Sequence, residues 1–170
     1  IMAMTMVNAG HIALAISAYQ TEYYLAWGTA RSDTDISKWR AENTPPAEDP
    51  ATTDLLLEVG RRIVTDKSYV KEDKENGTIE ANDTKWARSA TPTNHVYLMF
   101  KFEAKDAPTA VLRQVGLFTG TQKKASVPAT KYFLLPEDLE NKGALFMYQN
   151  IAPIVRNTAT REVFEYVITF

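Results

Sequence analysis

The chain has 170 residues, of which 45% are hydrophobic and 24% charged, and these values are typical of one globular domain with its own core. Its 19 basic and 21 acidic side chains give a formal net charge of −2, whereas nucleic-acid-binding proteins usually carry a concentrated basic face, so we expect no nucleic-acid partner. Because the chain has no cysteine, disulfides, thiolate metal sites and cysteine nucleophiles are excluded.

The first 30 residues are apolar enough to raise the question of a membrane span or a signal peptide. Polar residues interrupt the stretch and no lysine or arginine precedes Arg31, so we expect neither. Asn8 is a good helix N-cap residue, and apolar side chains then recur every three or four positions. The pattern predicts a helix with one face against the core or another subunit, and its contact candidates are Ile12, Ile16, Tyr19 and Tyr23.

The amino-acid composition changes twice in the segment after this helix. Residues 23–27 are aromatic and β-prone and Gly28 follows them, which predicts a short strand. Residues 31–54 are polar and rich in proline, so we expect a long exposed loop with a helical turn around residues 36–41. Residues 55–65 fit either a short helix or a strand, and we favour the strand.

The dipeptide Asn76-Gly77 is a strong hairpin signal, because both residues tolerate the positive φ of a tight turn. It predicts a hairpin between residues 68–74 and 78–81, both of which are polar. We therefore expect region 66–93 to project from the body of the protein.

Apolar runs in the second half of the chain predict further strands at residues 95–104, 111–118, 131–135, 144–151 and 161–170. The first is the clearest, because Val96, Leu98 and Phe100 fall on one face of an extended chain. One helix followed by about six to eight strands indicates an α+β fold. We expect a single domain over residues 1–170, with the N-terminal helix packed on a mostly antiparallel β-sheet and long polar loops.

Residues that could support catalysis or metal binding are scattered. His11 and His95 lie far apart in the sequence, and neither a serine nucleophile elbow nor a phosphate-binding glycine loop is present. Residues 33–35 resemble the start of a calcium loop, but Ser37 and Lys38 stand where further ligands are needed. The sequence therefore predicts no catalytic residue, no cofactor and no metal, and a small hydrolase would need an acid–base pair that we do not find.

The aromatic residues and one arginine are more informative. Trp39 and Trp86 lie in polar stretches, where they either fold back onto the edge of the core or anchor a partner protein. Arg113 lies on an otherwise apolar strand face. It either pairs with a buried carboxylate such as Glu58 or is a surface residue whose aliphatic stem covers the sheet.

Short motifs in chain order resemble the N-terminal anchoring domains of tail-collar and tail-fibre proteins of contractile-tailed bacteriophages. The matching segments are Val7-Asn8-Ala9-Gly10 with Leu14-Ala15, residues 25–29 (LAWGT), Glu58-Val59-Gly60-Arg61, residues 112–118 (LRQVGLF) and the closing strand 161–170. The chain departs from the family pattern at Gln114, where a glutamate is usual, and at Trp27 and Thr29. Because no fibre shaft follows Phe170, the resemblance suits a baseplate subunit or an adaptor between baseplate and fibre.

The resemblance implies a non-enzymatic virion structural protein that is made in the host cytoplasm and works in the tail baseplate. Its implied partners are other baseplate and tail proteins, including the tail fibre, in several copies set by the symmetry of the tail. The helix face and loop 31–54 are the candidate contact surfaces. The alternative function is a β-rich carbohydrate-binding module, in which exposed aromatic side chains stack on sugars.

Overall fold

The computed structural model describes residues 2–30, 33–40 and 44–170. The chain divides into two compact units: unit 1 holds Ile1–Glu22, Val64–Phe100 and Val163–Phe170, and unit 2 holds Tyr23–Ile63 and Lys101–Glu162. Each unit is formed by segments that are distant in the sequence. The single domain expected over residues 1–170 stays a prediction.

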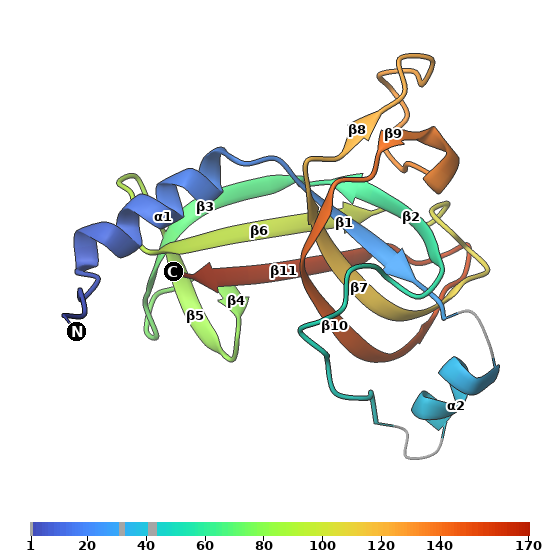
Figure 1. The fold of residues 1–170 in the computed structure, drawn as a ribbon, viewed down its shortest axis with the longest axis horizontal. Coiled ribbons are helices and arrows are strands. Elements are labelled where there is room, and N and C mark those ends of the chain that lie inside the picture. Colours follow the sequence, from blue (N-terminus) through green and yellow to red (C-terminus); the bar gives the residue numbers. More distant parts are fainter. Residues whose placement is uncertain (1, 31–32, 41–43) are drawn as a thin grey trace. The chain divides into compact units, whose positions relative to one another are not determined.

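The elements in chain order are α1 (Asn8–Gln20), β1 (Tyr23–Gly28), α2 (Asp33–Arg40), β2 (Glu58–Ile63), β3 (Asp66–Glu72), β4 (Ile79–Ala81), β5 (Thr84–Ser89), β6 (His95–Phe102), β7 (Val111–Thr119), β8 (Gln122–Lys123), the 3₁₀ helix η1 (Pro136–Asp138), β9 (Leu139–Asn141), β10 (Ala144–Val155) and β11 (Glu162–Thr169) (Figure 1). The strand pairs whose registers are resolved are antiparallel, which confirms the predicted fold class. The helical turn predicted around residues 36–41 belongs to α2, and residue 41 lies outside the described residues.

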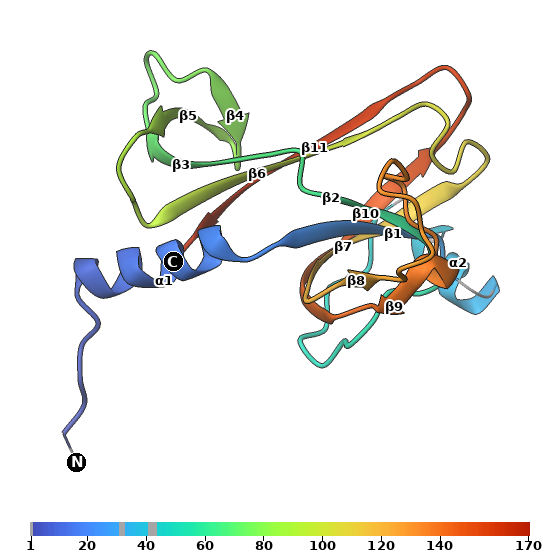
Figure 2. The same ribbon diagram turned by 90° about the horizontal axis from the view of Figure 1, so that it is seen from above.

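Unit 1 contains a five-stranded sheet with the order β11-β6-β3-β5-β4 (Figure 2). Its apolar core is a cluster of side chains from both halves of the sheet: Val70, Ile79, Trp86, Tyr97 and Val167. The sheet curls so that its first and last strands approach each other. The approach is seen in a hydrogen bond that Asn82 Nδ2, in the β4–β5 turn, donates to Val167 O of β11 at 2.7 Å. This contact covers part of the β11 edge.

The tight hairpin of unit 1 is not at the predicted dipeptide. Strands β3 and β4 both pair with β5, which lies between them, so Asn76-Gly77 does not join two paired strands. The prediction fails because Asp73 shapes that connection: its Oδ1 accepts the Asn76 N–H at 2.8 Å and its carbonyl accepts the Gly77 N–H. The two-residue turn lies instead at Asn82-Asp83, whose φ values of 54° and 59° match the turn that favours asparagine.

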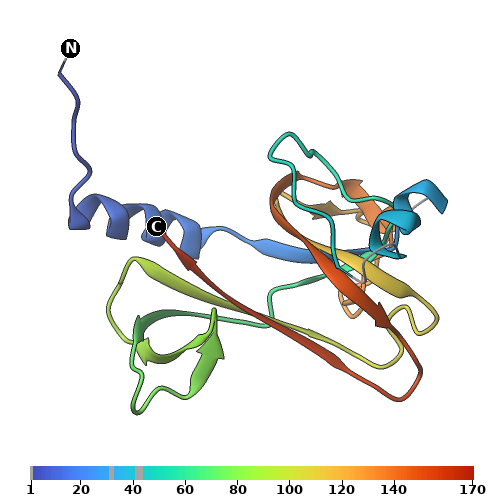
Figure 3. The same ribbon diagram turned by 90° about the horizontal axis from the view of Figure 1, so that it is seen from below.

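Unit 2 contains a four-stranded sheet with the order β10-β7-β1-β2, and the long strand β10 runs beside β7 (Figure 3). The predicted strands at residues 23–27, 55–65, 111–118 and 144–151 are confirmed here as β1, β2, β7 and β10. Every residue of β1 is buried, and Trp27 stacks on Phe102 with a centroid distance of 3.8 Å.

The run 131–135 forms a single bridge rather than the predicted strand. Leu134 exchanges two backbone hydrogen bonds with Arg61 at 2.8 and 2.9 Å, and pairing stops there. The neighbouring Phe133 ring lies directly over Gly60 of β2, where a Cβ atom would come within 2.2 Å of the ring. Glycine at this position therefore lets the segment pack onto the sheet edge without joining it.

Helix α1 begins one residue earlier than the capping pattern indicates. Val7, not Asn8, occupies the N-cap position, and its carbonyl accepts the N–H groups of Gly10 and His11. No side-chain hydrogen bond caps this end. The helix therefore relies on packing rather than on a polar cap for its start.

Candidate functional site

The surface of α1 is the most unusual in unit 1 because it is apolar on several sides. The helix carries no aspartate, glutamate, lysine or arginine over Asn8–Gln20. Ala15 and Ala18 are buried, whereas Leu14 is 47% exposed and Val7, just before the helix, is 64% exposed. Residues 2–6 continue away from the helix as an extended arm (Figure 2). Three methionines are exposed on this arm: Met2, Met4 and Met6.

The C-terminal end of α1 is anchored to β3. The Tyr19 ring stacks on Tyr69 with a centroid distance of 4.4 Å. The Lys67 ammonium donates to the carbonyl oxygens of Tyr19 at 2.5 Å and Thr21 at 3.4 Å, where a cation compensates the unpaired carbonyls and the helix dipole. The anchor holds one end of the helix, while the apolar residues toward its start stay accessible.

The sequence-predicted contact residues fall into two groups. Ile12, Ile16 and Tyr19 are half-buried on α1. Tyr23 belongs to β1 of unit 2 and is buried near Phe146.

The two tryptophans are buried within the chain. Trp39 of α2 donates its indole N–H to Ile151 O at 2.8 Å, and Trp86 of β5 donates to Ala81 O at 2.9 Å inside the unit 1 core. Of the two alternatives that the sequence leaves open, these positions favour packing against the core. A role of either ring in partner binding stays a prediction.

The proposed partner of Arg113 pairs with a different arginine. Arg113 Nη1 donates to Thr29 O at 2.9 Å, and no recorded contact between described residues joins Arg113 to Glu58. Glu58 instead accepts two hydrogen bonds from Arg61, at 3.1 Å from Nε and 2.5 Å from Nη2. Arg61 lies three residues after Glu58 and is fully buried. An unpaired charge would therefore cost more free energy at Arg61 than at the half-buried Arg113.

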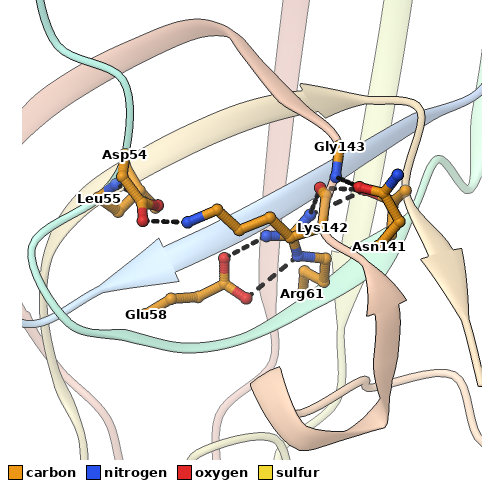
Figure 4. A network of polar contacts seen from close by, with 8 residues as sticks. Asp54, Leu55, Glu58, Arg61, Asn141, Lys142 and Gly143 are labelled. Carbon is orange, nitrogen blue, oxygen red and sulfur yellow. Dashed lines mark hydrogen bonds and ion pairs between the residues drawn. The ribbon is translucent and has the colours of Figure 1, made fainter.

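Arg61 is the centre of a polar lock that the sequence did not single out (Figure 4). Besides Glu58, its guanidinium donates to Thr121 Oγ1 at 2.8 Å and to Lys142 O at 2.7 Å. The Lys142 ammonium in turn pairs with Asp54. A pocket of about 270 Å³ lies beside these groups, but their mutual bonds leave Arg61 few donors for a ligand, so we interpret the lock as structural.

A second buried arginine, Arg156, bonds to backbone carbonyls of unit 2. Arg156 donates to the carbonyl oxygens of Glu103, Asp106 and Thr160 at 2.9 to 3.1 Å. Its guanidinium also lies 5.2 Å from the centre of the Trp27 ring. Arginine within a loop-rich segment is the only sequence signal that could have indicated this role.

The edges of the unit 2 sheet are covered at several points. On the β10 side, Asn150 N–H donates to Glu48 Oε1 and its side-chain amide donates to Pro46 O, both at 2.9 Å. On the β2 side, Leu134 takes both backbone groups of Arg61. Covered edges resist the addition of a foreign strand, so partner binding at these points must use side-chain surfaces.

Two kinds of feature are absent from the part of the chain that the structure describes: metal-ligand clusters and membrane-spanning helices. No three histidine, aspartate or glutamate side chains there gather closely enough to hold a metal ion. Within the same residues, no helix combines the length and the apolar character needed to cross a membrane.

Internal polar locks, covered sheet edges and an apolar helix describe a structural protein that works through contacts with other proteins. Residues 2–170 match the family "Baseplate wedge 3 tail fiber network component", and the chain belongs to that family. It is also similar to "Virion protein 3" of Enterococcus phage phiEF24C, with 28% identity over 151 residues that cover 82% of this chain and 79% of the relative.

The protein is therefore a non-enzymatic structural component of the phage virion, located at the tail baseplate. Its partners are baseplate and tail fibre proteins. The expectation drawn from the short motifs is confirmed at this level.

Proposed function

We propose that this wedge component binds a neighbouring baseplate protein through α1, Val7 and the arm of residues 2–6, in several copies related by the symmetry of the tail. The observation that carries the proposal is the uncharged helix with exposed Leu14 and Val7, held at its other end by Tyr19 and Lys67. Complete burial of a fully exposed apolar side chain contributes about 1.5–3 kcal/mol, and Leu14 and Val7 would contribute the part that corresponds to their exposed surface.

The anchoring at β3 supports a docking role because it fixes the orientation of the helix. An element that is already ordered loses less conformational entropy when a partner binds. The covered edges of the unit 2 sheet support the proposal indirectly, since they disfavour strand addition as the mode of contact. The half-buried Ile12 and Ile16 lie on the other flank of the helix and form a second apolar surface there.

The test is Leu14→Asp in phage that lack the wild-type gene and receive the variant from a plasmid. We expect the purified variant to fold, because about half of the Leu14 side chain is exposed and an aspartate there can reach solvent. We expect it to be lost from tails, because the contact would bury an uncompensated charge. Thr158→Asp, an exposed loop position in unit 2, is the charge-matched control and should enter tails normally. Normal incorporation of folded Leu14→Asp would refute the role of α1.

Quantitative mass spectrometry of purified tails tests the copy number. Closed symmetric assemblies contain a fixed multiple of each subunit. We expect a constant ratio of this chain to a tail protein of known stoichiometry, and a ratio that corresponds to one copy per tail would reject the multi-copy part of the proposal.

A further inference from the structure

A cleft on unit 2, distinct from α1 and from the Arg61 lock, carries unused positive charge. It lies beside the end of β2 and the segment 128–133 and has a volume of about 500 Å³. Its charged lining residues are Arg62, Lys105, Lys131 and Asp106. Asp106 and the adjacent Asp138 offset two of the three cations, so the cleft keeps one excess positive charge in a chain whose net charge is −2.

The anion in the cleft is already neutralised. Asp106 is 2% exposed, and its two carboxylate oxygens accept hydrogen bonds from Arg62 Nε at 2.6 Å and from Arg62 Nη2 at 3.3 Å. Lys131 pairs with Asp138 at 2.6 Å. Over the described residues, no ion pair is recorded for the exposed Lys105 and no hydrogen bond for Arg62 Nη1.

The segment of residues 128–133, which lines the cleft, is fixed to the sheet through Phe133. Phe133 lies over Gly60 and contacts the Trp27 and Phe102 rings at centroid distances of 6.1 and 6.3 Å. Tyr132 lies next to this anchor but is 60% exposed, so an aromatic face is displayed on a fixed segment. Fixed aromatic side chains beside charged groups are typical centres of protein–protein contacts.

We infer that this cleft binds an extended acidic segment of a neighbouring baseplate protein. A glutamate or aspartate carboxylate accepts charge-assisted hydrogen bonds from Lys105 and from Arg62 Nη1, and an adjacent apolar side chain packs on Tyr132. The inference rests on the proposed function as a subunit with several protein partners. It adds a second contact surface, which is positively charged and binds a negatively charged partner.

The full chain labelled with ¹⁵N is titrated with the acetylated peptide Gly-Glu-Leu-Glu-Gly, and the same peptide with glutamine in place of glutamate is the matched ligand. We expect the acidic peptide to shift the amide signals of Lys105 and Tyr132, and high salt to weaken this binding. Lys105→Glu should lower the affinity by about tenfold or more, a change typical of a lost charge pair. Lys124→Glu, an exposed lysine outside the cleft, should leave the affinity unchanged.

Equal binding of the glutamine peptide, or shifts confined to other parts of the chain, would overturn the inference. A chito-oligosaccharide that shifts the cleft signals while the acidic peptide does not would assign the cleft to sugar binding instead. These outcomes are independent of α1, because incorporation of Leu14→Asp into tails is measured without the peptide. The failure of one proposal is therefore distinguishable from the failure of the other.

Discussion

The two units of this protein are stabilised in different ways. Unit 1 has an apolar cluster around Trp86, and its ion pair Arg88–Asp66 lies at the surface. Unit 2 has its own apolar cluster at Ala26, Leu55 and Phe118, but it also buries charged side chains. Arg61 and Arg156 each bond to several backbone carbonyls or side chains. The difference follows from the connections. Long segments without regular structure leave backbone groups unpaired, and buried arginines with several donors satisfy them.

The largest effect is expected when the unit 2 lock is broken. Arg61→Ala leaves Glu58 as an unpaired, nearly buried carboxylate and removes the donors to Thr121 and Lys142 O, so we expect a loss of about 4–5 kcal/mol in the free energy of unfolding. Urea denaturation measures this loss. The matched control is Arg88→Ala, which breaks an exposed ion pair and should cost less than about 1 kcal/mol.

Hydrogen exchange read by mass spectrometry locates the effect of Arg61→Ala. We expect peptides from β2 and β10 to lose more protection than peptides from β3 and β5, because the lock lies within unit 2. An equal loss of protection in all four strands would contradict the claim that the two units are stabilised separately. It would support the single cooperative domain that the sequence predicts over residues 1–170.

The corresponding test of unit 1 removes its largest core side chain. Trp86→Ala creates a cavity among Val70, Ile79 and Tyr97 and removes the hydrogen bond to Ala81 O. We expect a loss of about 3 kcal/mol, at the lower end for tryptophan because the short strand β4 can relax into the space. Thermal denaturation checks the value, and a loss below about 1 kcal/mol would mean that this cluster is not the main support of unit 1.

The same contrast explains which features the sequence predicts. Alternation of apolar residues identified β6, since a strand with one buried face leaves that pattern in any sequence. Asn76-Gly77 wrongly predicted a hairpin turn, because Gly77 allows a close approach of two backbone segments instead. A Cβ atom at this position would come within 2.7 Å of Trp86 N in β5. The short apolar run 131–135 misled because, among its residues, only Leu134 forms a backbone bridge to the sheet.

The candidate site was less predictable than the fold. Trp39 and Trp86 stand in polar surroundings in the sequence, yet their rings are buried by contacts with segments that no local pattern reveals. The partner of Glu58 depends on strand register, which the sequence does not reveal. In the structure Arg61 bonds to Glu58, whereas Arg113 bonds to Thr29 O. The uncharged helix was predicted, because absence of charge is visible in the sequence alone.

A smaller effect is expected at the turn that closes the unit 1 sheet. Asn82 has a φ of 54° and donates to Val167 O, so Asn82→Ala introduces backbone strain and removes the hydrogen bond, for a loss of about 1–2 kcal/mol. Asn82→Gly removes only the hydrogen bond and should cost less. Chemical denaturation of both variants separates the two contributions, and identical losses would show that the strain of this turn is unimportant.

The smallest effect is a dependence of unit 1 stability on pH. Burial lowers the pKa of His95, whose Nδ1 lies 2.7 Å from Thr169 Oγ1 and whose ring lies against Trp86, while the negative charge of Glu72 partly opposes the shift. The folded state therefore binds the proton less readily than the unfolded state. Stability is full above the ordinary histidine pKa of about 6.5 and falls as the pH decreases through that value toward the lower folded-state pKa.

His95→Gln should flatten this part of the pH profile, because glutamine cannot take up a proton but can still hydrogen-bond to Thr169. Thermal denaturation between about pH 5 and pH 7.5 measures the slope for both proteins. A slope that persists unchanged in His95→Gln would assign the dependence to another group. Since the apolar core of unit 1 otherwise contains few titrating side chains, loss of the slope would show that its response to acid depends on one histidine at the edge of that core.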